Sequence, residues 1–244
     1  MVERVRLLAS SLLVLATFTG GLSMLLFAVF LFIGSLHLVQ MGLSEPVVLA
    51  WDGVLSVVFF VQHSGMIRRR FRTNLSSIVP AHYHGAVFTM ISSVVLVALV
   101  AFWQPSAISL YELQGLSRWL SRGVFFLAIA GIAWGADALR SFDPFGRAAI
   151  RAHLGGRPPR PQQFIIRGPY RWVRHPLYFF VLVLIWSYPV MTADRLLFNS
   201  LWTGWIFVGT ILEEKDLLAD MGGDYRDYQR RVPMLVPWRV PSDS

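Results

Sequence analysis

The segment Ile165-Ile-Arg-Gly-Pro-Tyr-Arg-Trp-Val-Arg-His-Pro-Leu-Tyr178 places cationic and aromatic side chains between two apolar segments. Gly168 and Pro169 suit the N-cap and first turn of a short helix, and Pro176 ends that helix because the residue before a proline avoids the α region. A helix over 169–175 would put three cationic side chains on one face, at i, i+3 and i+4: Arg171, Arg174 and His175. Such a face suits an anionic small molecule. The alternative is that these residues only anchor the next membrane span.

The composition is typical of a membrane protein. Of the 244 residues, 55% are hydrophobic and 15% are charged, with a mean hydropathy of +0.54, whereas a soluble domain has about 25% charged residues. The net charge of +8 comes from cations in the connections between apolar segments, which indicates membrane topology and not a nucleic-acid partner. The chain contains no cysteine, which excludes a disulfide framework and thiolate chemistry.

Several apolar segments approach the length of about 20 helical residues that crosses a bilayer. They cover residues 7–39, 47–61, 86–103, 119–136, 177–190 and 196–212. The first is too long for a signal peptide. Most arginines lie in alternate connections, so six spans with both termini cytoplasmic satisfy the positive-inside rule; five spans and one re-entrant segment are the alternative. The predicted fold is an all-α, polytopic membrane bundle of five to six helices, ending in a helical hairpin.

Two adjacent carboxylates, Glu213 and Glu214, close the last apolar segment. Neighbouring helical residues point about 100° apart, so one glutamate is expected to face a ligand and the other an arginine of the 165–178 segment. That pairing would compensate acidic groups at a helix C-terminus; a solvated helix end is the alternative. Tyr225 and Tyr228, three residues apart, can cover such a site or lie at the membrane interface.

These segments together resemble the integral-membrane methyltransferase superfamily. The resemblance rests on Gly168–Tyr178, on Glu213-Glu214, and on Gly222-x-x-Tyr225-x-x-Tyr228-x-x-x-Val232-Pro233. The superfamily includes isoprenylcysteine carboxyl methyltransferases, phospholipid methyltransferases, NnrU-like proteins and methanethiol S-methyltransferases. Three shorter upstream segments are similar to the methanethiol branch in particular: Gln62-His-Ser-Gly-Met66, Ser141-Phe-Asp-Pro-Phe-Gly146 and His153-Leu-Gly-Gly-Arg-Pro158.

The resemblance implies S-adenosylmethionine as the cofactor, bound near the cytoplasmic face. One domain would span 1–244, with N-terminal helices in 1–137 and the cofactor-binding part in 138–244. The expected cofactor site consists of the positions that match the family's motif and of the cationic and aromatic residues noted above. These are Tyr170, Arg171, Arg174, His175, Tyr178, Glu213, Glu214, Tyr225 and Tyr228. An arginine would hold the cofactor carboxylate, a glutamate its ammonium or a ribose hydroxyl, and tyrosine rings its adenine or sulfonium.

His63 and Glu214 are the residues expected to act in the reaction itself. His63 ends the second apolar segment beside Gln62 and a run of arginines. It is interpreted as a base that removes a thiol or amine proton; the alternative is a polar residue at headgroup level. No metal site is predicted, because no two histidines have the i, i+4 spacing of a helical zinc site.

The methyl acceptor stays open between three classes: a small thiol, a prenylated cysteine and a phospholipid amine. The upstream segments favour a thiol. Two other functions compete with methyl transfer. NADPH-dependent sterol or steroid reductases have a similar Arg-His-Pro helix pair, but theirs continues with Asn-Tyr, where this chain has Leu177. A non-enzymatic NnrU-like membrane protein would keep the fold without a closed site. The expected partners are the lipid bilayer and the acceptor; the oligomeric state does not follow from the sequence.

Overall fold

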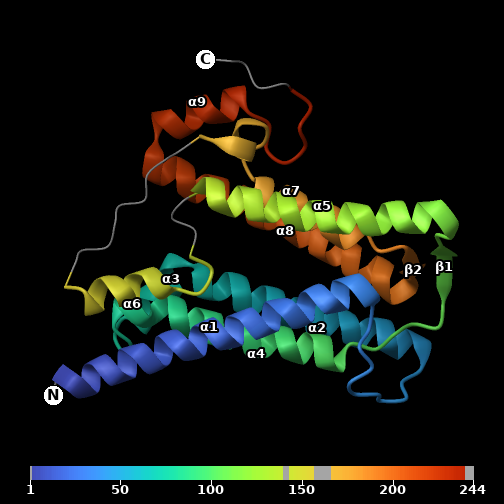
Figure 1. Cartoon of the computed structure of the whole chain (residues 1–244), viewed down its shortest axis with the longest axis horizontal. Coiled ribbons are helices and arrows are strands. Elements are labelled where there is room, and N and C mark those ends of the chain that lie inside the picture. The colour runs from blue at the N-terminus through green and yellow to red at the C-terminus, as the bar shows by residue number, and fades with distance from the viewer. Residues whose placement is uncertain (1, 140–142, 157–165, 240–244) are drawn as a thin grey trace. The chain divides into compact units, whose positions relative to one another are not determined.

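The computed structural model describes residues 2–139, 143–156 and 166–239 (Figure 1). The chain forms two compact units. Unit 1 comprises Met1–Ser106 and Asp143–Gln162, and unit 2 comprises Ala107–Phe142 and Gln163–Ser244.

Unit 1 is a bundle of three long helices, α1 (Val2–Ile33), α2 (Glu45–Ile67) and α4 (His84–Phe102), with three short helices, α3 (Arg69–Leu75), η1 (Ala81–Tyr83) and α6 (Arg147–Leu154). Small residues let α1 and α4 pack closely, and the hydroxyl of Ser23 donates to that of Ser93 across 3.1 Å. Gly146, which precedes α6 at φ +64°, lies directly against the backbone of Gly85 at the start of α4.

Polar groups close the opposite end of unit 1. Gln104, just after α4, accepts a hydrogen bond from the backbone N–H of Met41 and donates to the carbonyl of Val39. The backbone N–H of Gln104 donates in turn to the buried carboxylate of Asp52 on α2. These bonds attach the loop between α1 and α2 to the end of α4.

Unit 2 is built on α5 (Gly115–Leu139), α7 (Pro176–Trp186) and α8 (Ala193–Met221), with η2 (Gly168–Arg171) before α7 and α9 (Gly223–Arg231) after α8. Strands β1 (Ser109–Glu112) and β2 (Val190–Thr192) pair in antiparallel fashion. Two glycines of α5 bring α7 close: the Phe180 ring packs on Gly131, and Leu177 packs on Gly135.

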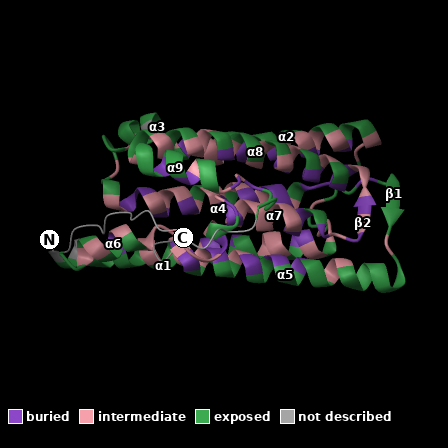
Figure 2. Ribbon diagram, turned by 90° about the horizontal axis from the view of Figure 1, so that it is seen from above, coloured by how far each residue is buried: buried purple, intermediate pink, exposed green. Residues whose placement is uncertain are grey.

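Within the described ranges, five helical segments are long and apolar enough to cross a membrane: Arg6–Ile33, Glu45–Ile67, Ala81–Phe102, Gly115–Leu139 and Ala193–Met221. Large apolar side chains are exposed along them, among them Leu25, Val61, Val94 and Leu127, and Figure 2 shows exposed positions along the long helices. Apolar exposure on this scale is typical of a lipid-facing surface. The chain is therefore an integral membrane protein, and the predicted all-α polytopic bundle is confirmed.

The structure differs from the predicted helical hairpin in α7, the first of its two helices. The apolar segment 177–190 is helical only as far as Trp186, and its last residue, Val190, begins β2. At 1.5 Å per residue, the 11 residues of α7 reach only about 16 Å. Residues 187–189 turn, and β2 follows at Val190–Thr192 before α8 begins at Ala193.

Candidate functional site

The Arg-His-Pro segment of unit 2 is held by backbone contacts on two sides. The N–H groups of Arg174 and His175 donate to the carbonyls of Pro233 and Met234, at 2.8 and 3.1 Å, so the chain after α9 pairs with the chain before α7. On the other side, Gly168 has φ +58° and lies against α5, where an added Cβ would come within 3.2 Å of Trp134 and Ala138. This close approach and left-handed conformation require glycine.

The predicted helix over 169–175 is wrong beyond Arg171. The structure has the short η2 over Gly168–Arg171, and the following residues leave the helix to pair with Pro233 and Met234. Because η2 ends at Arg171, this exposed residue does not share a helical face with Arg174. Arg167 lies 3.8 Å from the exposed carboxylate of Asp137.

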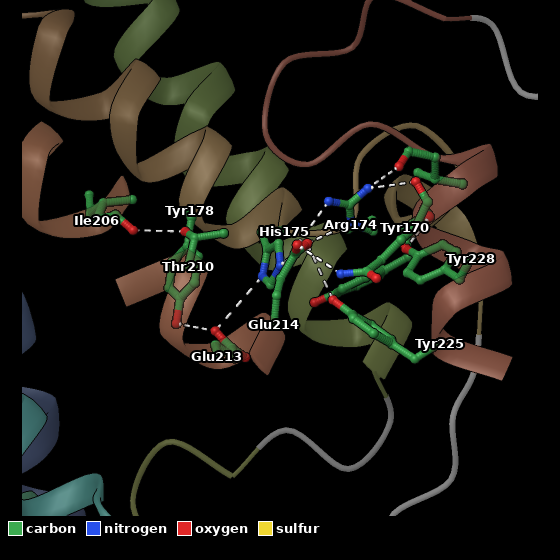
Figure 3. A network of polar contacts seen from close by, with 12 residues as sticks. Tyr170, Arg174, His175, Tyr178, Ile206, Thr210, Glu213, Glu214, Tyr225 and Tyr228 are labelled. Atoms are coloured by element: carbon green, nitrogen blue, oxygen red, sulfur yellow. Dashed lines mark hydrogen bonds and ion pairs between the residues drawn. The ribbon is translucent and has the colours of Figure 1, made fainter. Parts of the chain in front are cut away.

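Glu214 lies at the centre of the polar network drawn in Figure 3. Its carboxylate accepts hydrogen bonds from four side chains that come from the Arg-His-Pro segment and from α9: Arg174, His175, Tyr225 and Gln229. Arg174 contributes two of them, from Nε at 2.5 Å and from Nη2 at 3.0 Å. The donors surround a carboxylate that is only 12% exposed, so Glu214 has little capacity left for a ligand.

Arg174 is as fully occupied as its partner. Besides its two bonds to Glu214, Nη1 donates to the carbonyls of Gln229 and Val232, at 3.0 and 2.5 Å. Of the five N–H donors of a guanidinium, four are thereby used. The guanidinium thus joins α8 to the end of α9, and within the described part of the chain a single N–H is left over for a ligand carboxylate.

Glu213 has a different environment. Its Oε2 accepts a hydrogen bond from the hydroxyl of Tyr178 at 2.7 Å and lies 3.8 Å from Nδ1 of His175. The side chain is 44% exposed, against 12% for Glu214. The about 100° between successive helical residues turns the two carboxylates in different directions. Glu213 is therefore the glutamate with room for further donors.

Four tyrosines frame these carboxylates. The hydroxyl of Tyr228 donates to the carbonyl of Tyr170 at 2.6 Å, which links α9 to η2. Tyr178 stacks on His175 with ring centroids 5.6 Å apart, and the rings of Tyr225 and Tyr228 meet edge to face. The structure thus brings together every predicted cofactor-site residue except the exposed Arg171.

The phenols outside the membrane-spanning helices are held in their neutral form. Burial, with the nearby charge of Glu213, raises the pKa of Tyr170. Burial and the charge of Glu214 raise the pKa of Tyr225, and burial with neighbouring Tyr225 raises that of Tyr228. At neutral pH these groups therefore donate hydrogen bonds and carry no charge.

His63 lies away from this polar network, and two of the predicted upstream segments fall partly outside the described residues. His63 is on α2 in unit 1, where its ring centroid lies 5.2 Å from that of Phe59 and 5.0 Å from that of Phe88. The segments 141–146 and 153–158 are only partly described, because residues 140–142 and 157–165 lie outside the described ranges. Within those ranges, no group of three His, Cys, Asp or Glu side chains is placed to hold a metal ion.

Sequence reasoning missed Gln229 and the backbone pairing of Pro233 and Met234. Gln229 follows Tyr225 by four residues on α9, so the i, i+4 spacing that relates helical neighbours was a signal for it. The backbone pairing had no such signal, because it depends on where α9 ends in space.

The chain is similar to proteins named methanethiol S-methyltransferase in several bacteria. It is 35% identical to methanethiol S-methyltransferase 1 of Bradyrhizobium diazoefficiens over 191 residues, which are 76% of this chain and 66% of that protein. It is 36% identical to the Pseudomonas deceptionensis protein over 80% of this chain and 75% of the relative, and 34% identical to the Mycobacterium tuberculosis protein over 83% and 82%. No model of a known protein family matches the chain, and no solved structure matches it.

Proposed function

This chain belongs to the methanethiol S-methyltransferase family, and we propose that it transfers the methyl group of S-adenosylmethionine to a small thiol such as methanethiol. The observation that carries the proposal is the pair Glu213 and Glu214, held against the Arg-His-Pro segment in a membrane protein 34–36% identical to those relatives. The relatives' names supply the thiol, and the chemistry of the site supports the donor.

The residues around Glu213 suit a cationic cofactor. A half-exposed carboxylate beside aromatic rings attracts an ammonium group by charge and a sulfonium by contact with the ring face. Glu213 and Tyr178 would therefore bind the cationic parts of S-adenosylmethionine, with Tyr170 beside them. Glu214, Arg174 and the C-terminal segment hold these groups in place and make fewer contacts with the ligand.

S-adenosylmethionine supplies an activated methyl group when it is bound. Methyl transfer is an in-line displacement, so the contribution of the protein is mainly to align the acceptor sulfur with the methyl carbon. A site among membrane helices is also poor in water, which favours the reaction of a thiolate with a sulfonium because both charges disappear as the bond forms.

The competing functions have less support. The relatives named above are methyltransferases, which favours neither a sterol reductase nor a non-enzymatic protein. Prenylated cysteine and phosphatidylethanolamine stay as alternative acceptors for the experiment. We further propose that the Glu213 end of unit 2 faces the cytoplasm, because the neighbouring connections carry most of the arginines.

The test uses the whole protein purified in detergent. Labelled S-adenosylmethionine is incubated separately with methanethiol, a prenylated cysteine and phosphatidylethanolamine, and the methylated products are measured. Calorimetry with S-adenosylhomocysteine and with NADPH identifies the cofactor independently of turnover. We expect S-adenosylhomocysteine to bind and methanethiol to be converted to dimethyl sulfide. Binding of NADPH alone, or methylation of the phospholipid alone, would overturn the proposal.

A further inference from the structure

His175 is held by one carboxylate and faces a second one. Its Nε2 lies 3.1 Å from Oε1 of Glu214, and the two-point pair with Arg174 keeps that carboxylate ionised. An ionised carboxylate only accepts hydrogen bonds, so Nε2 of His175 carries the ring proton. A neutral imidazole has a single N–H group, and Nδ1 therefore presents a lone pair.

The lone pair of Nδ1 is directed toward the more exposed carboxylate. Nδ1 lies 3.8 Å from Oε2 of Glu213, which is too far for a hydrogen bond, and no hydrogen bond among the described residues uses Nδ1. Figure 3 shows this contact beside the hydroxyl of Tyr178. The side chain of His175 is 6% exposed, but that of Glu213 is 44% exposed, so a ligand that reaches Glu213 also comes close to Nδ1.

Two acceptors that face each other leave a place for a proton. We propose that Nδ1 of His175 takes the proton of the thiol acceptor, so that the groups that act on the thiol all belong to unit 2. The proposal rests on the proposed function, and it gives His175 the role that the sequence suggested for His63. A general base has to be oriented by a further group. Glu214 does this for His175, and the stacked ring of Tyr178 fixes the plane of the imidazole.

The surroundings of His175 suit a ring that becomes positively charged during the reaction. The charge would lie 3.1 Å from a carboxylate oxygen of Glu214 and 3.8 Å from one of Glu213. Opposite charges at these distances offset the cost of placing a charge in a nearly buried site. The other titratable or charged groups around the ring come from every neighbouring element: Arg174, Tyr170 of η2, Tyr178 of α7 and Tyr225 of α9.

The geometry gives His175 a defined step in the reaction. The S–H bond of the thiol breaks and its proton goes to Nδ1, while the electron pair of that bond forms the new bond between sulfur and the methyl carbon. The bond between that carbon and the sulfonium breaks, and its electron pair stays on the departing sulfur. His175 afterwards releases the proton to water, which restores the neutral ring.

His175→Gln tests this step, because the Nε2 amide of glutamine can still donate to Glu214 while the basic nitrogen is lost. We expect kcat/KM for methanethiol at pH 7 to fall about 100-fold or more, the usual range for a lost general base. The loss should shrink as pH approaches the pKa of the thiol, about 8.5 or above, because the thiolate then forms without help. For the same reason it should be smaller with trifluoroethanethiol, a more acidic thiol.

Calorimetry with S-adenosylhomocysteine separates this role from a structural one. The affinity of His175→Gln should be close to that of the parent, because Glu213 and Tyr178 remain. The matched control is His153→Gln, which changes an exposed histidine of unit 1 and should keep the pH profile of the parent. If His175→Gln does not bind S-adenosylhomocysteine, the parent carries the test. Its kcat/KM for methanethiol should be lower in D2O than in H2O, because the bond from sulfur to hydrogen breaks in the reaction itself.

Two results would overturn the inference. One is a parent-like pH profile in His175→Gln, with or without weaker cofactor binding, since Nδ1 would then at most contact the cofactor. The other is a parent rate that is equal or higher in D2O, since the thiolate would then form before the reaction. A parent that binds the cofactor but methylates no thiol would instead overturn the proposed function.

Discussion

Arg174 and Glu214 form a two-point ion pair, with Nε 2.5 Å from Oε1 and Nη2 3.0 Å from Oε2. The arginine and glutamate side chains are only 9% and 12% exposed. The pair joins the segment before α7 to α8, and Arg174 extends the connection to the end of α9 through the carbonyls of Gln229 and Val232. The principal charge pair of the site is therefore a framework, around which the groups that meet the ligand are arranged.

Glu214→Gln should destabilise unit 2. The substitution leaves the nearly buried guanidinium of Arg174 without its counter-charge, and breaking a buried pair in this way costs about 3 kcal/mol. Thermal and denaturant unfolding in detergent would measure the loss. The control is Glu112→Gln, which breaks an exposed ion pair with Arg118: the side chains of Arg118 and Glu112 are 46% and 47% exposed. Exposed pairs contribute about 0–1 kcal/mol. Equal stability of the two variants would contradict a framework role for Glu214.

Glu213→Gln should instead weaken cofactor binding. Among the described residues, Glu213 accepts a hydrogen bond only from the hydroxyl of Tyr178, and it is 44% exposed, so its loss should change the unfolding free energy little. Losing a hydrogen bond from a cationic ligand should reduce affinity by about 1.5–3 kcal/mol. Calorimetry with S-adenosylmethionine and S-adenosylhomocysteine measures the change. Parent-like affinity in Glu213→Gln would show that this carboxylate does not contact the ligand.

The tyrosines predict how stability depends on pH. The pKa values of Tyr170, Tyr225 and Tyr228 are raised above the ordinary value of 10 by burial and by nearby groups. Their contribution to stability is complete below pH 10, and it is lost as pH rises further because the unfolded chain then releases phenolic protons that the folded chain retains. The melting temperature should therefore decline above pH 10. Tyr225→Phe should reduce that slope, and an identical slope in this variant would exclude Tyr225 as a source.

The contact between Gly85 and Gly146 predicts a severe effect of one added methyl group. In Gly146→Ala the new Cβ would lie 2.3 Å from the backbone of Gly85, at a residue with φ +64°. Overpacking against backbone costs about 1–3 kcal/mol, and the left-handed conformation about 1–2 kcal/mol more. Gly53→Ala on α2 meets nothing within 4 Å and should stabilise its helix by about 0.5–1 kcal/mol. Chemical unfolding in detergent compares the two; similar stabilities would contradict the packing.

Membrane topology gives the last prediction. In unit 2, α7 begins beside the end of α8, so the chain returns to the side from which it entered. The arginine-rich connections then predict both termini and residues 138–175 on the cytoplasmic side, with residues 113–115 opposite. Reporter fusions at these positions would measure it. A reporter in 138–175 that is active outside the cytoplasm would reverse the orientation.

The spans could be predicted because length and hydropathy depend on local sequence. The early end of α7 had a signal in Pro189, because the residue before a proline avoids the α region. The strand Val190–Thr192 had none, because it forms by pairing with Ser109–Glu112. That partner lies some 80 residues earlier and is exposed at all four positions, so it lacks the alternation that identifies a strand.

In the site, the meeting of the glutamates with the Arg-His-Pro segment followed from charge, but the roles of the two carboxylates did not. Helical spacing shows that Glu213 and Glu214 point apart, not which of them meets Arg174. That choice is made by α9, whose direction depends on Gly222 at φ 59° and ψ −122°. A backbone turn of this kind lies in a region open to glycine, and sequence alone does not specify the path that follows it.

The change from helix to strand between Trp186 and Val190 also constrains how deeply the protein can lie in the membrane. An extended residue advances about 3.3 Å, against 1.5 Å in a helix, but its N–H and C=O groups need partners outside its own segment. Each strand of the pair β1 and β2 has one neighbour in the described sheet, so its other edge requires water or lipid headgroups. The strand pair therefore has to lie in the water or in the headgroup layer at the membrane surface. A bilayer thick enough to bury the strand pair in its hydrocarbon core should oppose insertion of unit 2.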